Sequence, residues 1–204
     1  NDDEDGYSII DDFFNKYSRI KDNIDFKGKN STCTNLVLKY RNSFAIWNIV
    51  EVLSFYDFTK LYEVYYKKHN NKNSLERYLW SVRFLRNAAA HNGCLLNSLR
   101  TPYNYTVYPN REVINYLSKI KSISRTARRS RMKNPVMHDF IVTLYVFNNV
   151  ISSKEVKRIT MIELKDLLDN RMRRNKEFFN KNQILMANYD FAKKVVDYFY
   201  GLCV

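Results

Sequence analysis

The chain has 204 residues, of which 45% are hydrophobic and 15% aromatic, so it can bury a substantial core and is not a disordered polymer. No apolar run reaches the roughly 20 residues of a spanning helix, and the acidic start NDDEDGYSII is unlike a signal peptide. We therefore expect a cytoplasmic protein without membrane contact. Three scattered cysteines without a C-x-x-C spacing favour free thiols over a disulfide framework.

The formal net charge of +13 is unevenly distributed. Residues 1–25 hold eight acidic and three basic side chains, which leaves 31 basic and 13 acidic residues over 26–204. Such an excess is typical of a polyanion binder, and also of a merely soluble basic surface. We divide the chain into an acidic helical segment, 1–32, and a helical domain, 33–204. Because the first residue is not Met, we expect an upstream part of the natural chain to be missing.

Apolar residues follow a helical spacing nearly throughout. A first stripe is formed by Ile9, Ile10, Phe13, Phe14 and Tyr17. The run 42–56 is apolar on most sides and predicts one central buried helix, whose single charge would need a partner. Helices over 57–68 and 74–91 follow, the second with Ser74 as its N-cap.

The second half of the chain has clearer helix boundaries. Pro102 and Pro109 predict a long loop over about 97–111, followed by a helix over about 112–129. Asn134-Pro135 predicts the next helix start, and the capping box Thr160-x-x-Glu163 predicts another. A last helix covers about 182–202. The pattern predicts an all-α helical bundle.

Several chemistries are excluded by spacing. The four glycines lie too far apart for a nucleotide-binding loop, so no nucleotide cofactor is expected. The three histidines form no H-x-x-x-H pattern. His91 and Cys94 could face one ion, but two ligands are a weak signal, and no metal is expected.

One stretch, FLRNAAAHNGCLLN at 84–97, carries a candidate site. Arg86 and His91 are five positions apart and point roughly 140° away from each other on a regular helix. Arg83, Asn87 and His91 share one stripe, which the long Arg86 side chain can reach. The three alanines at 88–90 leave this part of the helix thin, so another backbone, from this chain or from a second copy, can approach.

RNA gives such a cluster a reaction without metal. A ribose 2′-OH attacks its own adjacent phosphate when a base removes the proton and a cation stabilises the developing charge. Histidine suits the proton transfer and arginine the phosphate. By pattern alone, an ordinary polar stripe remains the commoner interpretation of this spacing.

The surrounding residues resemble the Abi-like (AbiD/AbiF-type) abortive-infection proteins with a HEPN ribonuclease domain. Their pattern W-x4-L-R-N-x2-A-H-x3-L-x-N begins here at Trp80, and their upstream W-x3-E-x2-S-F begins at Trp47. RNAAAH also fits the R-x4-H signature of HEPN domains. Two departures are Tyr56, where the family often has Gly, and Cys94-Leu95-Leu96, where a basic-Leu-aromatic triplet is usual.

The resemblance implies a HEPN-like helical bundle that pairs so that two R-x4-H motifs form one metal-independent RNase site. It assigns Arg86 to phosphate binding, His91 to acid–base catalysis and Asn87 to orienting it. It assigns Trp47, Glu51 and Trp80 to packing and to holding the motif helix, with Glu51 alternatively partnering an arginine. The implied partners are RNA, a second copy and, in a toxin-type system, an antitoxin.

Two further basic runs lie downstream, and each is either an RNA contact or a solvated basic face. With Arg83, the expected RNA-binding residues are Arg125, Arg128, Arg129, Arg131, Lys133, Arg171, Arg173 and Arg174. The many tyrosines could stack bases, but their helical spacing assigns most of them to the core.

Three hypotheses follow. The first is a homodimeric HEPN endoribonuclease of an antiphage or toxin-type system. The second is a catalytically inactive RNA-binding module, and the third is a helical protein-interaction domain.

Overall fold

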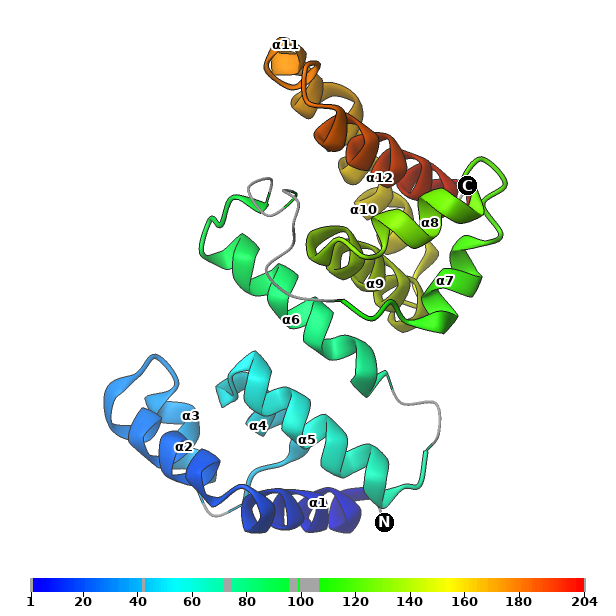
Figure 1. Cartoon of the computed structure of the whole chain (residues 1–204). Coiled ribbons are helices and arrows are strands. Elements are labelled where there is room, and N and C mark those ends of the chain that lie inside the picture. The colour runs from blue at the N-terminus through cyan, green and yellow to red at the C-terminus, as the bar shows by residue number, and fades with distance from the viewer. Residues whose placement is uncertain (1, 42, 72–74, 96–98, 100–106, 204) are drawn as a thin grey trace. The chain divides into compact units, whose positions relative to one another are not determined.

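The computed structural model describes residues 2–41, 43–71, 75–95, 99 and 107–203. Over these ranges the chain forms helices and turns and no strand, which confirms the all-α prediction. The chain divides into two compact units, Asn1–Leu79 and Trp80–Val204, each of which is drawn as packed helices in Figure 1. The predicted boundary after residue 32 falls inside the first unit and stays a prediction.

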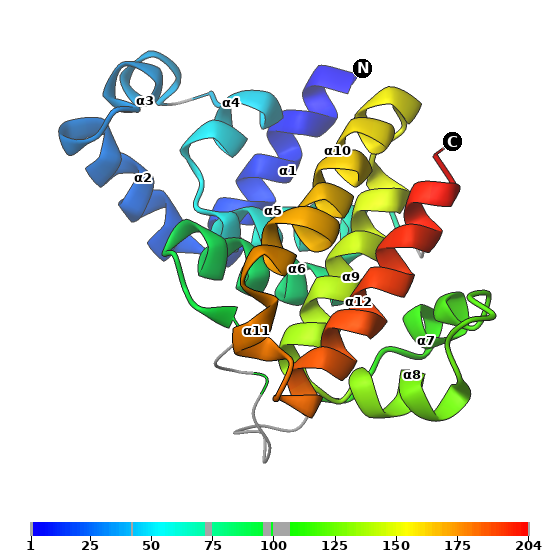
Figure 2. The same ribbon diagram turned by 90° about the horizontal axis from the view of Figure 1, so that it is seen from above.

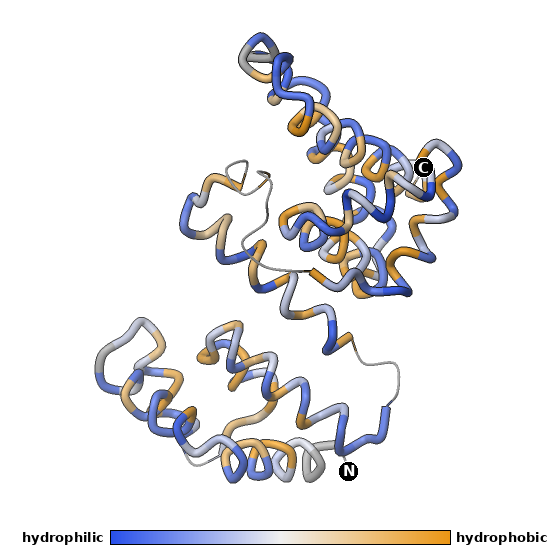
Figure 3. Tube along the Cα trace, in the orientation of Figure 1, coloured by the Kyte–Doolittle hydropathy of each residue, from blue (hydrophilic) through white to orange (hydrophobic). Residues whose placement is uncertain are grey.

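The first unit is built from α1 (Asp2–Lys16), α2 (Ser18–Asn30), α3 (Thr34–Tyr40), α4 (Ile46–Val52) and α5 (Phe55–Lys68). Figure 3 shows hydrophobic and hydrophilic residues alternating along α1, as the predicted stripe requires. Ile9, Ile10 and Phe13 from that stripe are buried in the core of this unit. A Cβ added to Gly28 of α2 would lie 2.8 Å from Val37 Cγ1 of α3, so only glycine permits this close approach.

The single buried helix predicted over 42–56 is wrong, because the chain leaves the helix at Leu53 (ψ 144°) and starts α5 at Phe55. Ser54 causes the new start. Its Oγ accepts a hydrogen bond from the Asp57 amide at 3.1 Å and donates to Asp57 Oδ2 at 2.7 Å. Since α4 is then short and partly exposed, Glu51 reaches solvent instead of needing a buried partner.

The second unit contains most of α6 (Glu76–Ala90), then α7 (Arg111–Leu117), α8 (Arg125–Arg131), α9 (Pro135–Val150) and α10 (Lys154–Asp166). After α10 come a π-helical turn η2 (Leu167–Arg171), a 3₁₀ turn η3 (Met172–Asn175), α11 (Lys176–Phe179) and α12 (Gln183–Gly201). Figure 2 shows α9 and α10 beside α12, and the core of this unit lies between them.

Two helix starts here are as predicted. Asn134 caps α9, with Oδ1 accepting from the Met137 amide at 3.0 Å, and Asn182 caps α12 in the same way. The capping box at Thr160 is wrong, because Ser153 caps α10 and Thr160 lies within that helix. The helix over 112–129 is also wrong. The chain turns after Leu117, buries Ile120 and Ile123, and restarts at the Ser124 cap. Ser74, Pro102 and most of the 97–111 loop lie outside the described residues.

Aromatic side chains fill part of this core, as their spacing predicts. The ring of Tyr116 packs against those of Tyr145, Tyr198 and Phe199 at centroid distances of 5.3 to 6.1 Å. Burial raises the pKa of Tyr116 to about 12. Within the described ranges, no helix combines the length and the apolar character that crossing a bilayer requires.

Candidate functional site

The R-x4-H motif lies at the end of α6, and the backbone there forms a Schellman turn. The Asn92 amide donates to the Ala89 carbonyl at 3.2 Å, and the Gly93 amide donates to the Ala88 carbonyl at 2.7 Å. Asn92 takes a positive φ of 50°, which asparagine tolerates better than most residues. His91 is therefore the C-cap, and it stands where the helix stops and not inside it.

The side chains that the sequence selected lie at an open surface. Arg86 Nη1 donates to Asn87 Oδ1 at 3.1 Å, so these two neighbours are held together. Arg86 and His91 are exposed, as are the last two alanines between them, Ala89 and Ala90. The guanidinium has five N–H donors, and most of them stay available for an anion after the contact with Asn87.

Earlier on the same helix, Arg83 contacts an aromatic ring. Its guanidinium lies over the Trp80 ring at 5.2 Å, and the Trp80 and Phe84 rings are 5.1 Å apart in an edge-to-face arrangement. Trp80 is 59% exposed and Trp47 on α4 is 64% exposed. Trp80 thus packs on side chains of its own helix, and the packing roles expected of Trp47 and of the exposed Glu51 stay predictions.

The α6 helix is fixed to α9 below this surface. Ser81 is buried, and its Oγ lies 3.5 Å from Nδ1 of His138, which is itself 3.2 Å from Asp139 Oδ1. A hydrolytic triad needs the serine and the carboxylate on opposite ring nitrogens, whereas here both face Nδ1. We interpret the cluster as a structural contact.

A second helix end has the same backbone. His69 caps α5, Asn70 has φ 48°, and the Asn71 amide donates to the Tyr66 carbonyl at 3.1 Å. The His69 ring lies 4.6 Å from the Tyr65 ring. No arginine stands five residues before His69, so this exposed histidine is a natural control for His91.

Some basic residues of the run at α8 line a surface depression, and others do not. Arg125, Arg129 and Lys133 line a surface depression together with Thr126 and Ser130. Their spacing of four residues places the three cations along one side.

The other two arginines of this run differ in their contacts and burial. Arg128 Nη1 instead donates to the Ile123 carbonyl at 2.7 Å and stabilises the turn before α8. Arg131 is half-buried. In the depression, by contrast, the three cations and the hydroxyl groups of Thr126 and Ser130 are donors suited to a phosphate backbone.

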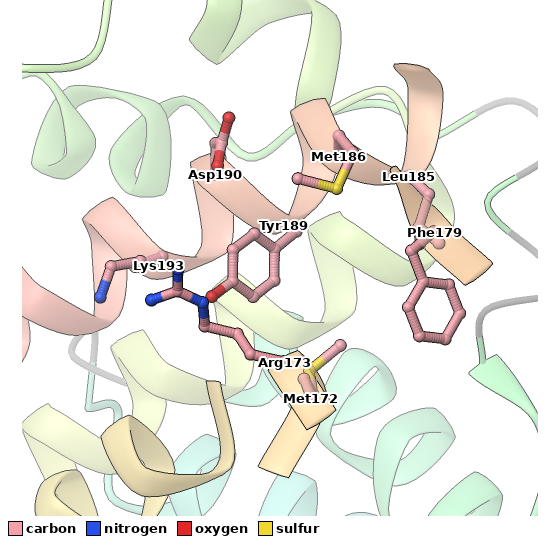
Figure 4. A pocket seen from close by; sticks show the side chains of 8 residues that line it. All are labelled: Met172, Arg173, Phe179, Leu185, Met186, Tyr189, Asp190 and Lys193. Atoms are coloured by element: carbon pink, nitrogen blue, oxygen red, sulfur yellow. The ribbon is translucent and has the colours of Figure 1, made fainter. Parts of the chain in front are cut away.

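The second basic run lies on η2 and η3, where Arg171, Arg173 and Arg174 are exposed. Arg173 also lines a pocket against α12, shown in Figure 4. The spacing of the arginines could indicate a basic surface, but it could not indicate this pocket, whose walls come from three separate elements.

Cys94 is exposed with a free thiol, and Asn97 of the motif lies outside the described residues. Among the residues that the structure describes, no three His, Cys, Asp or Glu side chains gather as a metal site would require.

Comparison with known proteins gives one match. Residues 2–97 match the family model described as Abi-like protein. The match supports an Abi-like family for the first unit and the motif helix together, and this family suggests an abortive-infection function. No curated protein matches the chain, and no solved structure matches it.

Proposed function

We propose that this protein is a metal-independent endoribonuclease of the HEPN type, acting in an Abi-like abortive-infection system as a homodimer joined at the end of α6. The observation that carries the proposal is the exposed surface at this end, where Arg86 is held against Asn87 and His91 is the C-cap. The Abi-like match includes all three residues.

In this proposal the 2′-oxygen of a ribose attacks the adjacent phosphorus, and the bond to the 5′-oxygen of the next nucleotide breaks. His91 takes the proton of the 2′-OH, and a protonated histidine gives one to the leaving oxygen. Arg86 stabilises the charge on the phosphate oxygens. The products are a 2′,3′-cyclic phosphate and a 5′-OH end.

The two proton transfers explain why a second copy is proposed. A base and an acid are both needed, and the R-x4-H motif supplies one histidine per chain. A facing motif from the partner supplies the other. The exposed Ala89 and Ala90 support the proposal, because small side chains let a second backbone come near.

The test is cleavage of labelled RNA in EDTA by the wild-type protein, Arg86→Ala and His91→Ala. We expect His91→Ala to lower the rate by about 10²- to 10⁴-fold, the usual contribution of a general acid–base group. Arg86→Ala should lower it by about 10²- to 10³-fold, the usual contribution of a donor that stabilises the developing charge. His69→Ala is the matched control and should keep the wild-type rate. Cleavage that persists in both motif variants, or that needs a divalent metal, would contradict the proposal.

A second candidate is an RNA-binding module without catalysis, which the α8 depression favours. Changing Arg125, Arg129 and Lys133 to Gln should weaken single-stranded RNA binding and reduce its salt slope by about 0.7 per lost phosphate contact. Lys119→Gln with Lys121→Gln, on the preceding turn, is the control. Tight binding by the wild type without cleavage would select this candidate over the first.

A further inference from the structure

A pocket of about 230 Å³ lies in the second unit between α12 and the η3–α11 segment (Figure 4). Its apolar walls are Met172 of η3, Phe179 of α11, and Leu185, Met186 and Tyr189 of α12. Tyr189 is three positions after Met186 and four after Leu185, so its side chain neighbours both of theirs on α12. The pocket is thus formed by tertiary packing of neighbouring elements.

The local backbone and its contacts fix the position of the α12 wall. The chain leaves α10 through the π-helical turn η2, a geometry that is frequent at functional sites. The Tyr189 hydroxyl donates to the Leu168 carbonyl in this turn at 2.8 Å. Lys193 forms an ion pair with Asp169, so a second contact holds α12 against η2.

Charged groups surround the apolar walls unequally. Figure 4 shows Arg173 and Lys193 at one side of the pocket and Phe179 at the other. The Lys193 ammonium is neutralised by Asp169 and lies 3.7 Å from Asp197. Arg173 is exposed and, within the described part of the chain, has no carboxylate partner. Asp190 also lines the pocket, so an anion there would meet Arg173, a cation without an ion pair among the described residues, and would have to lie away from the Asp190 carboxylate.

Size and chemistry narrow the class of ligand. A cavity of roughly 150 Å³ holds a benzene ring, whereas drug-sized ligands fill about 300 to 1,000 Å³. A pocket of about 230 Å³ fits one flat ring system of the size of a nucleobase. Two aromatic rings and two thioethers offer the polarisable surfaces on which such a ring packs.

We infer that this pocket binds one unstacked nucleobase while Arg173 contacts the phosphate attached to it. Single-stranded RNA is recognised through splayed bases that pack on aromatic side chains beside basic groups. As a subsite for an RNA substrate, the pocket rests on the function proposed above. Base binding itself does not, because the same chemistry is offered by a free nucleotide.

Binding is measured without cleavage, in EDTA, by calorimetry with the four nucleoside 5′-monophosphates and by fluorescence anisotropy with a labelled single-stranded RNA. Met186→Trp fills the pocket, and Arg173→Gln removes the cation at its edge. Lys194→Gln is the matched control, because this exposed cation on α12 neighbours Lys193 but does not line the pocket. Thermal unfolding followed by circular dichroism shows that each variant is folded.

We expect at least a tenfold loss of affinity in Met186→Trp and in Arg173→Gln, and none in Lys194→Gln. If the pocket variants lose affinity for an RNA that carries a base but not for the same RNA with an abasic residue, an RNA base is the ligand. Loss for the monophosphates alone identifies a free nucleotide. Unchanged affinity for every probe in both pocket variants overturns the inference. If cleavage depends on His91 but the pocket variants keep their affinity, only the pocket inference is rejected. If the pocket variants lose affinity but the wild type does not cleave RNA, only the nuclease proposal is rejected.

Discussion

Helices α5 and α6 end in the same backbone structure but with different side chains around it. Both have a histidine C-cap followed by an asparagine of positive φ, 48° at Asn70 and 50° at Asn92. At the α5 end, Tyr65 packs on His69, and Lys68 Nζ lies 2.8 Å from Asp12 Oδ2. The His–Asn ending is therefore a way of stopping a helix, and by itself it is no sign of a site.

What distinguishes the α6 end is the turn before it. There the positions four and five residues before the histidine are Asn87 and Arg86, which hydrogen-bond to each other, and small exposed alanines follow. At α5 the corresponding positions are Tyr65 and the buried Val64. The proposed chemistry depends on this difference, so it can be tested by making the same substitution at both helix ends.

The largest effect is expected from Asn92→Val and Asn70→Val. A β-branched residue in the left-handed region costs about 1 to 2 kcal/mol, so each variant should lose a similar free energy of unfolding in a urea titration. Only Asn92→Val should also lower RNA cleavage, because it displaces His91. Asn→Gly at either position should change stability by a few tenths of a kcal/mol. Equal loss of cleavage in both valine variants would remove the functional distinction.

A smaller effect is expected one residue later. A Cβ at Gly93 would lie 3.2 Å from the Ala88 carbonyl oxygen, so Gly93→Ala must push this turn apart slightly. Asn71 already carries a side chain at the equivalent position of α5. We expect Gly93→Ala to lower the free energy of unfolding by about 1 kcal/mol, which a lower melting temperature would show. Asn71→Ala should change the free energy of unfolding by no more than about 0.5 kcal/mol. Identical shifts would show that the two turns pack alike.

The sequence predicted helices where polar caps and apolar stripes agree, as at Asn134-Pro135 and over 182–202. It failed at Ser54, because an apolar run hides a break that a single serine makes. It also failed at Thr160, where a matching box lies inside a helix that Ser153 starts. Periodicity says which face is apolar, whereas the start of a helix depends on which of several candidate caps is used.

For the site, the sequence selected Arg86, Asn87 and His91, and it ended their helix at His91, one residue after the last helical residue, Ala90. The Asn92-Gly93 pair is a helix-stop signal and could have located the C-cap. The contact of Arg128 with the Ile123 carbonyl and the pocket beside Arg173 could not be predicted, since both depend on how separate segments pack. The roles of all these residues in RNA chemistry stay predictions.

The smallest effect concerns charge. Glu63 fixes α5 to α1, with Lys16 Nζ at 2.8 Å and the Tyr17 hydroxyl donating at 3.1 Å. The hydrogen bond from Lys16 is the main cause that lowers the pKa of Glu63 from 4.5. A lowered folded-state pKa means that the ionised group stabilises the fold above the unfolded-state value and that this stability is lost as the pH falls through the folded-state value.

Glu63→Gln should therefore cost about 0.5 to 1 kcal/mol in urea unfolding at neutral pH, and the cost should vanish below the folded-state pKa of Glu63. At the α6 end, Arg86 and His91 have no carboxylate partner in the described ranges, and Asn87 does not titrate. Asn87→Ala should thus change the unfolding free energy by the same amount at neutral pH and at a pH below the folded-state pKa of Glu63. If the two variants respond to pH in the same way, the Lys16–Glu63 ion pair adds no stability to the contact of α5 with α1, and this charge does not distinguish the two helices.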